Sequence, residues 1–141
     1  MSETKRQKIL ARISTLISAI PDIHYVEINR MTVVDVDNVP FPAVFIFSAR
    51  ESFIEDTRAT IGYENYLWQI NLEVWGENVD METLLGKIHV AMFEDYTFRG
   101  NAQKSWRSGV DFWAVDPERH LSAMLIDYTI IYRHPVGNPY G

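Results

Sequence analysis

The sequence has no cysteine, and this absence removes several kinds of chemistry at once. Disulfide bridges, thiolate metal sites and a cysteine nucleophile are all excluded. No run approaches the roughly 18 apolar residues that a membrane span needs. The apolar residues near the start are interrupted by Arg12 and Ser14, so no signal-peptide core is expected there. We therefore expect a soluble, intracellular protein without disulfides.

Recognisable catalytic and ligand-binding motifs are also missing. The histidines are His24, His89, His120 and His134, and no two of them have the HxxxH or HExxH spacing of a helix-borne metal site. The glycines are scattered, so they build no phosphate-binding loop, and no G-x-S-x-G turn presents a serine nucleophile. We predict no catalytic, cofactor-binding or metal-binding residues, and therefore no enzyme.

Basic residues are outnumbered, with 13 Lys and Arg against 19 Asp and Glu and a formal net charge of −6. Tight, sequence-independent DNA binding needs clustered Lys and Arg residues that neutralise phosphates, and the excess of acidic residues does not favour it. By contrast, 47% of the 141 residues are hydrophobic, which is enough for one folded core. No repeat or linker interrupts the chain, so residues 1–141 are expected to form a single domain.

Two segments have the spacing of amphipathic helices. Thr4 and Gln7 fit a capping box, and apolar residues then recur every three or four positions until Pro21 ends the helix near Ile20. A similar apolar stripe predicts a second helix over Met81–Phe93.

Five segments have the pattern of strands. The clearest is Glu64–Trp75, where apolar and polar residues alternate as in a sheet with one covered and one wet face. Pro42–Ala49 is apolar on both faces and suits a central strand. The other three strands are expected near residues 25–30, 106–115 and 122–133.

The resulting order is α-β-β-β-α-β-β, which indicates an α+β fold. Short connections favour antiparallel pairing, so we expect a mostly antiparallel sheet with both helices packed on one face. The other face is expected to be wet, with isolated large apolar residues such as Trp75 and Ile131. Such a face is either ordinary surface or a protein contact.

Two polar segments are candidate contact regions. Arg50–Tyr63 either extends its flanking strands as a long hairpin or forms a mobile loop, and long loops are often functional. Thr97–Gly109 is basic with interleaved aromatics, which suits an acidic partner, or another copy of this acidic chain, better than nucleic acid. The candidate interface residues in these segments are Phe53, Ile54, Glu55, Arg99, Lys104 and Arg107.

The C-terminal end is the most recognisable stretch. A strongly β-forming run ends in Tyr132-Arg133-His134, and Gly137-Asn138-Pro139-Tyr140 follows. Together with the order of elements and the long polar loop, this ending resembles the tail terminator proteins of long-tailed bacteriophages, also called tail completion or minor tail proteins. The resemblance covers nearly the full chain in the order of its elements.

The resemblance implies an architectural role. Such proteins form a ring, commonly of about six copies, which caps the tail tube, stops its polymerisation and provides the docking surface for the head connector. The implied partners are other copies of the chain, the tail tube protein and the head–tail connector protein. DNA would only pass through the lumen, and no membrane is involved. The implied location is the tail or neck of the virion, after assembly in the host cytoplasm.

On this reading, residues 135–141 form an extended C-terminal arm. Its two prolines stiffen it and lower the entropy cost of ordering it against a neighbour. Tyr140 is expected to anchor on the next subunit or on the tube, so that deleting the arm weakens assembly and leaves folding intact. The candidate interface residues at this end are Arg133, His134 and Tyr140.

Two other interpretations stay open. Another neck or head-closure protein is hardly separable by sequence. A small-molecule-binding or enzymatic α+β domain would instead use the concave sheet face as a pocket, with convergent polar groups of shifted pKa. A ring subunit needs two unlike, complementary patches. The candidate patches are acidic (Glu51, Glu55, Asp56) and basic (Arg99, Lys104, Arg107).

Overall fold

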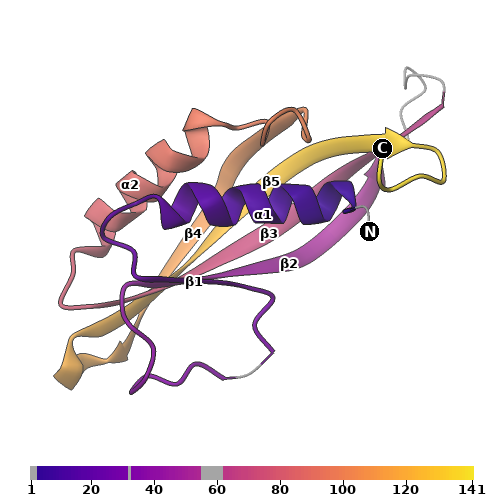
Figure 1. Ribbon diagram of the computed structural model, residues 1–141. Helices are drawn as coiled ribbons and strands as arrows, with labels where there is room; N and C mark the ends of the chain where they lie inside the picture. Colours follow the sequence, from indigo (N-terminus) through magenta and orange to yellow (C-terminus); the bar gives the residue numbers. More distant parts are fainter. Residues whose placement is uncertain (1–2, 32, 55–61) are drawn as a thin grey trace.

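The computed structural model describes residues 3–31, 33–54 and 62–141 (Figure 1). Within these ranges the chain forms an α+β fold with two helices and a five-stranded, mostly antiparallel sheet, as the sequence predicts. None of the described helices is long and apolar enough to cross a membrane. The elements in chain order are α1 (Lys5–Ser18), β1 (Tyr25–Ile28), β2 (Ala43–Ile54), β3 (Tyr63–Glu77), α2 (Met81–Glu94), β4 (Lys104–Asp116), the short 3-10 helix η1 (Pro117–Arg119) and β5 (Leu121–Pro135).

Both helices cover one face of the sheet (Figure 1). At the start of α1, the Gln7 amide donates to the Thr4 hydroxyl at 3.1 Å, and the Thr4 amide donates to the Gln7 side chain at 2.8 Å. The predicted capping box is therefore present. The apolar stripes of both helices meet the inward residues of β3 and β5, where alternation places Trp68, Ile70 and Tyr132 in the core.

The sheet has the strand order β1-β2-β3-β5-β4, so β4 and the short β1 are its two edges. Three of the four pairings are antiparallel, but β1 runs parallel to β2, with Tyr25 opposite Ala43. The expectation of antiparallel pairing is wrong for this pair. Residues 29–42 form a connection long enough for the chain to return and enter β2 in the same direction.

The face opposite the helices is only partly wet. Residues of the 29–42 connection pack against it and form a second, smaller cluster with Ala43 and Phe45. In this cluster the rings of Phe41 and Trp75 stack with their centroids 6.3 Å apart. Trp75, which the sequence suggested as an isolated apolar residue on a wet face, therefore belongs to this small core.

The polar segment 50–63 continues its flanking strands in its described part. β2 runs to Ile54, which lies opposite Asn65 of β3, after a bulge between Ser48 and Arg50. This register favours the long-hairpin interpretation for residues 50–54 and 62–63. The candidate residues Glu55 and Asp56 lie outside the described residues.

The last residues of the chain turn back instead of extending as an arm, in contrast to the sequence expectation. The Val136 amide donates to the Gly62 carbonyl at 2.9 Å, and the Lys5 amide at the start of α1 donates to the Pro139 carbonyl at 2.8 Å. Gly137, at φ +71°, has the left-handed conformation that this turn needs. Figure 1 shows the yellow C-terminal loop beside the first turn of α1.

Candidate interaction surfaces

One partly buried polar cluster joins α1 to the sheet and is the first place to look for chemistry. The Trp68 indole donates to the Ser48 hydroxyl at 2.9 Å, and Arg6 donates to the same oxygen. The Arg6 guanidinium lies 4.6 Å from the centroid of the Trp68 ring, and 3.8 Å separates it from the Glu51 carboxylate. Glu51 also accepts a hydrogen bond from the Tyr132 hydroxyl.

This cluster is suited to structure and not to acid–base catalysis. Burial, and then the hydrogen bond to Glu51, raise the pKa of Tyr132, so its hydroxyl stays protonated and is a poor base or nucleophile. Each polar group of the cluster is satisfied by a neighbour, which is how a protein holds buried polar groups at low cost. In the part of the chain that the structure describes, no group of His, Cys, Asp and Glu side chains is placed to hold a metal ion.

The two candidate contact residues at the end of β5 point to opposite faces. His134 is only 8% exposed, and its ring centroid lies 5.2 Å from that of Tyr66. It therefore has little surface to offer a partner, and the structure does not favour it as an interface residue. Arg133 is partly exposed, with its guanidinium 4.7 Å from the centroid of the Tyr63 ring.

The candidates on β2 and in the tail are more accessible. Phe53 is 61% exposed, although one edge of its ring contacts Tyr66 at a centroid distance of 5.7 Å. Ile54 is partly buried. Tyr140 is exposed, and its carbonyl accepts from the Lys8 ammonium at 3.4 Å. Phe53 therefore offers an exposed apolar side chain at one end of the sheet.

Of the three candidate basic residues, Lys104 and Arg107 line one cavity between α2 and β4, and Arg99 lies apart from them. Lys104 lies opposite Ile131 and Arg107 lies opposite Tyr128, so alternation directs their side chains to opposite faces of β4. Arg99 lies in the turn that follows α2 and approaches α1 instead. Sequence proximity suggested a surface shared by all three residues, and the structure separates Arg99 from the other two.

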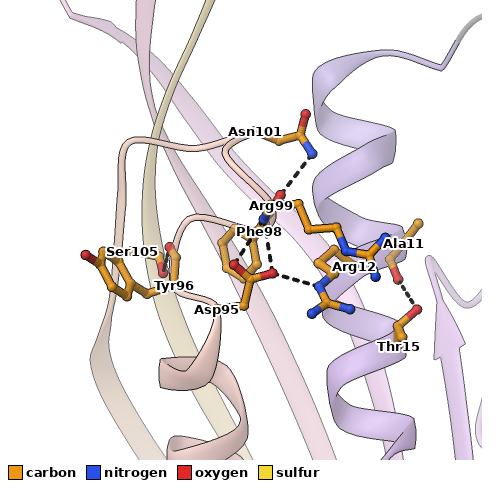
Figure 2. Close-up of polar contacts among 9 residues, drawn as sticks. All are labelled: Ala11, Arg12, Thr15, Asp95, Tyr96, Phe98, Arg99, Asn101 and Ser105. Atoms are coloured by element: carbon orange, nitrogen blue, oxygen red, sulfur yellow. Dashed lines mark hydrogen bonds and ion pairs between the residues drawn. The ribbon is translucent and has the colours of Figure 1, made fainter.

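Arg99 instead lies beside basic side chains of α1 (Figure 2). The Asp95 carboxylate accepts from the Arg99 amide at 3.0 and 3.1 Å and from Arg12 Nε at 2.7 Å. Burial opposes ionisation of Asp95, but these hydrogen bonds outweigh it and lower its pKa. Arg99, Arg12 and Lys8 line one shallow cavity of about 270 Å³. The signal for this patch was the i, i+4 spacing of Lys8 and Arg12 on one helix face.

A larger exposed surface lies along the free edge of the sheet. No described strand pairs with the outer edge of β4. Large apolar side chains are exposed on β4 and at the end of α2 and the turn that follows it, which is unusual for a long edge strand in a monomer. We call this surface the aromatic edge and define it by Phe93, Tyr96, Trp106, Phe112 and Trp113.

Comparison with protein-family models gives no match, and comparison with curated protein sequences gives none.

The aromatic edge includes a groove between α2 and β4 of about 390 Å³, which we call the α2–β4 groove. Tyr128 lies at its floor, and its buried hydroxyl has no hydrogen-bond partner among the described residues. Sequence reasoning did not single out Phe93 and Tyr96. Phe93 lies in the last turn of α2 and Tyr96 just after its end, so helical periodicity alone did not pair them.

Two further exposed apolar residues were also missed. Met31 and Val33, in the connection between β1 and β2, are 94% and 90% exposed.

Proposed function

We propose that this chain is a structural virion protein of the tail terminator kind. It caps the phage tail tube as a ring, stops polymerisation of the tube and provides the docking surface for the head connector. The order of elements and the C-terminal ending carry the resemblance. The observation that adds most support is the aromatic edge, because a free edge strand flanked by exposed aromatics suits protein association.

The proposed partners are other copies of the chain, the tail tube protein and the connector protein. An assembly of identical copies around a tube uses a heterologous interface, in which one surface of each copy meets a different surface of the next. The chain has unlike exposed surfaces at separate places, namely the aromatic edge, the Phe53 end of the hairpin and the basic patch of Lys8, Arg12 and Arg99.

A second candidate is a small-molecule-binding or enzymatic domain. One observation favours it, which is the α2–β4 groove with the unpaired Tyr128 hydroxyl at its floor. Another neck or head-closure protein remains a variant of the first proposal, since it would need the same kinds of surface.

The proposal is tested by the mass of the purified protein, measured by light scattering over a wide concentration range, with negative-stain images of each peak. A closed ring of about six copies is the expected result. The same preparation is then added to tail tubes, where we expect it at one end only and expect tube growth to stop. A protein that stays monomeric at every concentration and leaves tube growth unchanged would overturn the proposal.

A matched pair of variants tests whether the hairpin end takes part. Replacing Phe53 and Ile54 with serine should impair assembly, because an exposed apolar contact is lost. Val90→Ser is the control, since Val90 is as exposed as Phe53 but lies on α2, away from the hairpin. Unchanged assembly of the double variant would remove this end of the sheet from the interface.

A further inference from the structure

The α2–β4 groove is a cavity lined by aromatic rings. Its volume of about 390 Å³ falls within the range of roughly 300–1,000 Å³ that small-molecule sites occupy. Phe93 of α2 and Tyr96 in the turn that follows stack with their ring centroids 5.7 Å apart, and Trp106 lines the groove from β4. Flat apolar surfaces of this kind suit the ring system of an aromatic ligand.

A hydrogen bond joins the turn after α2 to β4 at this cavity. The Ser105 hydroxyl donates to the Tyr96 carbonyl at 2.7 Å (Figure 2). Both residues line the groove. The backbone at Tyr96 is therefore held against β4 before a ligand arrives, which lowers the ordering cost of binding.

The groove carries positive charge that no described carboxylate offsets. Lys104 and Arg107 both line it, and neither forms an ion pair with an Asp or Glu side chain in the part of the chain that the structure describes. The Lys104 ammonium lies 5.2 Å from the centroid of the Trp106 ring. None of the lining residues, all of them described, is Asp or Glu. In a chain with net charge −6, a locally basic groove of this kind favours an anionic ligand.

Tyr128 adds a hydrogen-bond donor at the floor of the groove. Its side chain is 3% exposed, and its hydroxyl has no hydrogen-bond partner among the described residues. Arg107 lies opposite Tyr128 in the β4–β5 pairing, so the guanidinium and the hydroxyl belong to the same face of the sheet. A buried hydroxyl without a partner costs desolvation free energy, and a ligand oxygen that accepts from it removes this cost.

We propose that the α2–β4 groove binds a small aromatic carboxylate. The ring of the ligand packs against the aromatic side chains, and its carboxylate accepts from Lys104, Arg107 and the Tyr128 hydroxyl. A planar carboxylate matches the fork of a guanidinium group and forms strong, charge-assisted hydrogen bonds with it. The inference goes beyond the proposed ring function and holds whether or not the chain forms a ring. Phe112 and Trp113 of the aromatic edge do not line the groove, so they stay open to a protein partner while a ligand is bound.

Isothermal titration calorimetry of the full chain with 2-naphthaleneacetate tests the site. We expect saturable binding of one molecule per chain. The neutral amide of the same acid keeps the rings and loses the charge, so it should bind at least about tenfold more weakly. Acetate keeps the charge and loses the rings, and it should show no saturable binding at the same concentrations. No saturable binding of 2-naphthaleneacetate, or equal affinity for the acid and its amide, would overturn the proposal.

Matched variants show whether the ligand lies in this groove. Arg107→Gln and Tyr128→Phe should each weaken binding of 2-naphthaleneacetate by about tenfold, because each removes one donor to the carboxylate. Both should fold, since Arg107 is exposed and the Tyr128 hydroxyl has no partner to lose among the described residues. Lys8→Gln is the control: it also removes one positive charge, but it lines a different cavity and should change the affinity less than about twofold. Wild-type affinity in either groove variant, or an equal loss in the control, would overturn the assignment.

A peptide arm separates two sources of the same chemistry. A short blocked peptide with one aspartate beside one phenylalanine also offers a carboxylate and an aromatic ring, and we expect it to bind more weakly than 2-naphthaleneacetate. Tighter binding of the peptide would overturn the assignment to a small acid and make the groove a protein contact. Light scattering of the same preparation separates this inference from the proposed function. Rings that do not bind the acid overturn the inference alone, whereas a chain that binds the acid, forms no ring and leaves tube growth unchanged overturns the proposed function alone.

Discussion

Two tyrosines on the same face of β5 show how single hydroxyl groups differ in this protein. Tyr128 and Tyr132 are both buried, at 3% and 2% exposure. The Tyr132 hydroxyl donates to Glu51, whereas the Tyr128 hydroxyl has no partner among the described residues. A buried hydroxyl that makes a hydrogen bond contributes to stability, and one without a partner costs desolvation free energy.

Replacing each tyrosine with phenylalanine is therefore expected to have unequal effects. Tyr132→Phe removes a hydrogen bond to a carboxylate and should lower the free energy of unfolding by about 1.5–3 kcal/mol. Tyr128→Phe removes an unpaired hydroxyl and should leave this free energy unchanged or raise it by up to about 1 kcal/mol. Urea unfolding followed by tryptophan fluorescence measures both. Equal losses in the two variants would mean that Tyr128 has a hydrogen-bond partner in solution.

The pH dependence of the free energy of unfolding should also show the effect of burying Tyr128. Burial raises the pKa of Tyr128 to about 12, against a smaller lowering effect of Arg107. Because the pKa in the folded state lies above its value near 10 in the unfolded state, this contribution to stability is complete below about pH 10. It is lost as the pH rises through about 12. The loss of unfolding free energy over this range should be smaller in Tyr128→Phe than in the wild type, and an identical loss would contradict the assignment.

At the scale of elements, local periodicity was enough to predict the helices and the long strands. The capping box of Thr4 and Gln7 and the alternation through Trp68 and Ile70 are properties of neighbouring residues, and the structure has them where the sequence places them. These patterns directly determine which side of an element meets the core.

Features that depend on distant contacts were not predictable from local patterns. The parallel pairing of β1 and the packing of Phe41 on Trp75 depend on where a long connection crosses the sheet. Among the candidate site residues, His134 has the sequence environment of a strand end, and only the tertiary neighbours Tyr66 and Glu64 show that it is buried. The basic stretch was only partly predictable for a related reason, since the turn after α2 carries Arg99 away from the cavity that Lys104 and Arg107 line.

The C-terminal turn is expected to stabilise the monomer. Deleting residues 136–141 removes the hydrogen bonds from Lys5 to Pro139 and from Val136 to Gly62, and it should lower the free energy of unfolding by about 1–2 kcal/mol. Tyr140→Ala is the control, because it keeps these backbone bonds, and it should change stability by less than about 0.5 kcal/mol. Thermal melts of the isolated monomer provide the measurement. A truncated chain with unchanged stability would restore the interpretation of this segment as a free contact arm.

For the molecule as a whole, the distribution of charge bears on whether DNA is held or only passes. Several basic side chains already form ion pairs with carboxylates: Arg12 with Asp95, Arg119 with Glu77, and Lys87 with Asp22. Each such ion pair lowers the number of Lys and Arg side chains that can neutralise DNA phosphates. The surrounding net charge of −6 opposes the approach of a polyanion.

We therefore expect no measurable binding of double-stranded DNA near physiological salt. Affinity for DNA rises steeply as salt falls, by several powers of ten for a protein that contacts many phosphates. Fluorescence anisotropy of a labelled duplex at about 50 mM and about 150 mM salt tests this directly. Any weak signal from the patch of Lys8, Arg12 and Arg99 should appear only at the lower salt concentration and should weaken further in Lys8→Ser. Micromolar binding that persists at the higher salt concentration would mean that the protein grips DNA, and a ring subunit whose lumen lets DNA slide would then be the wrong description.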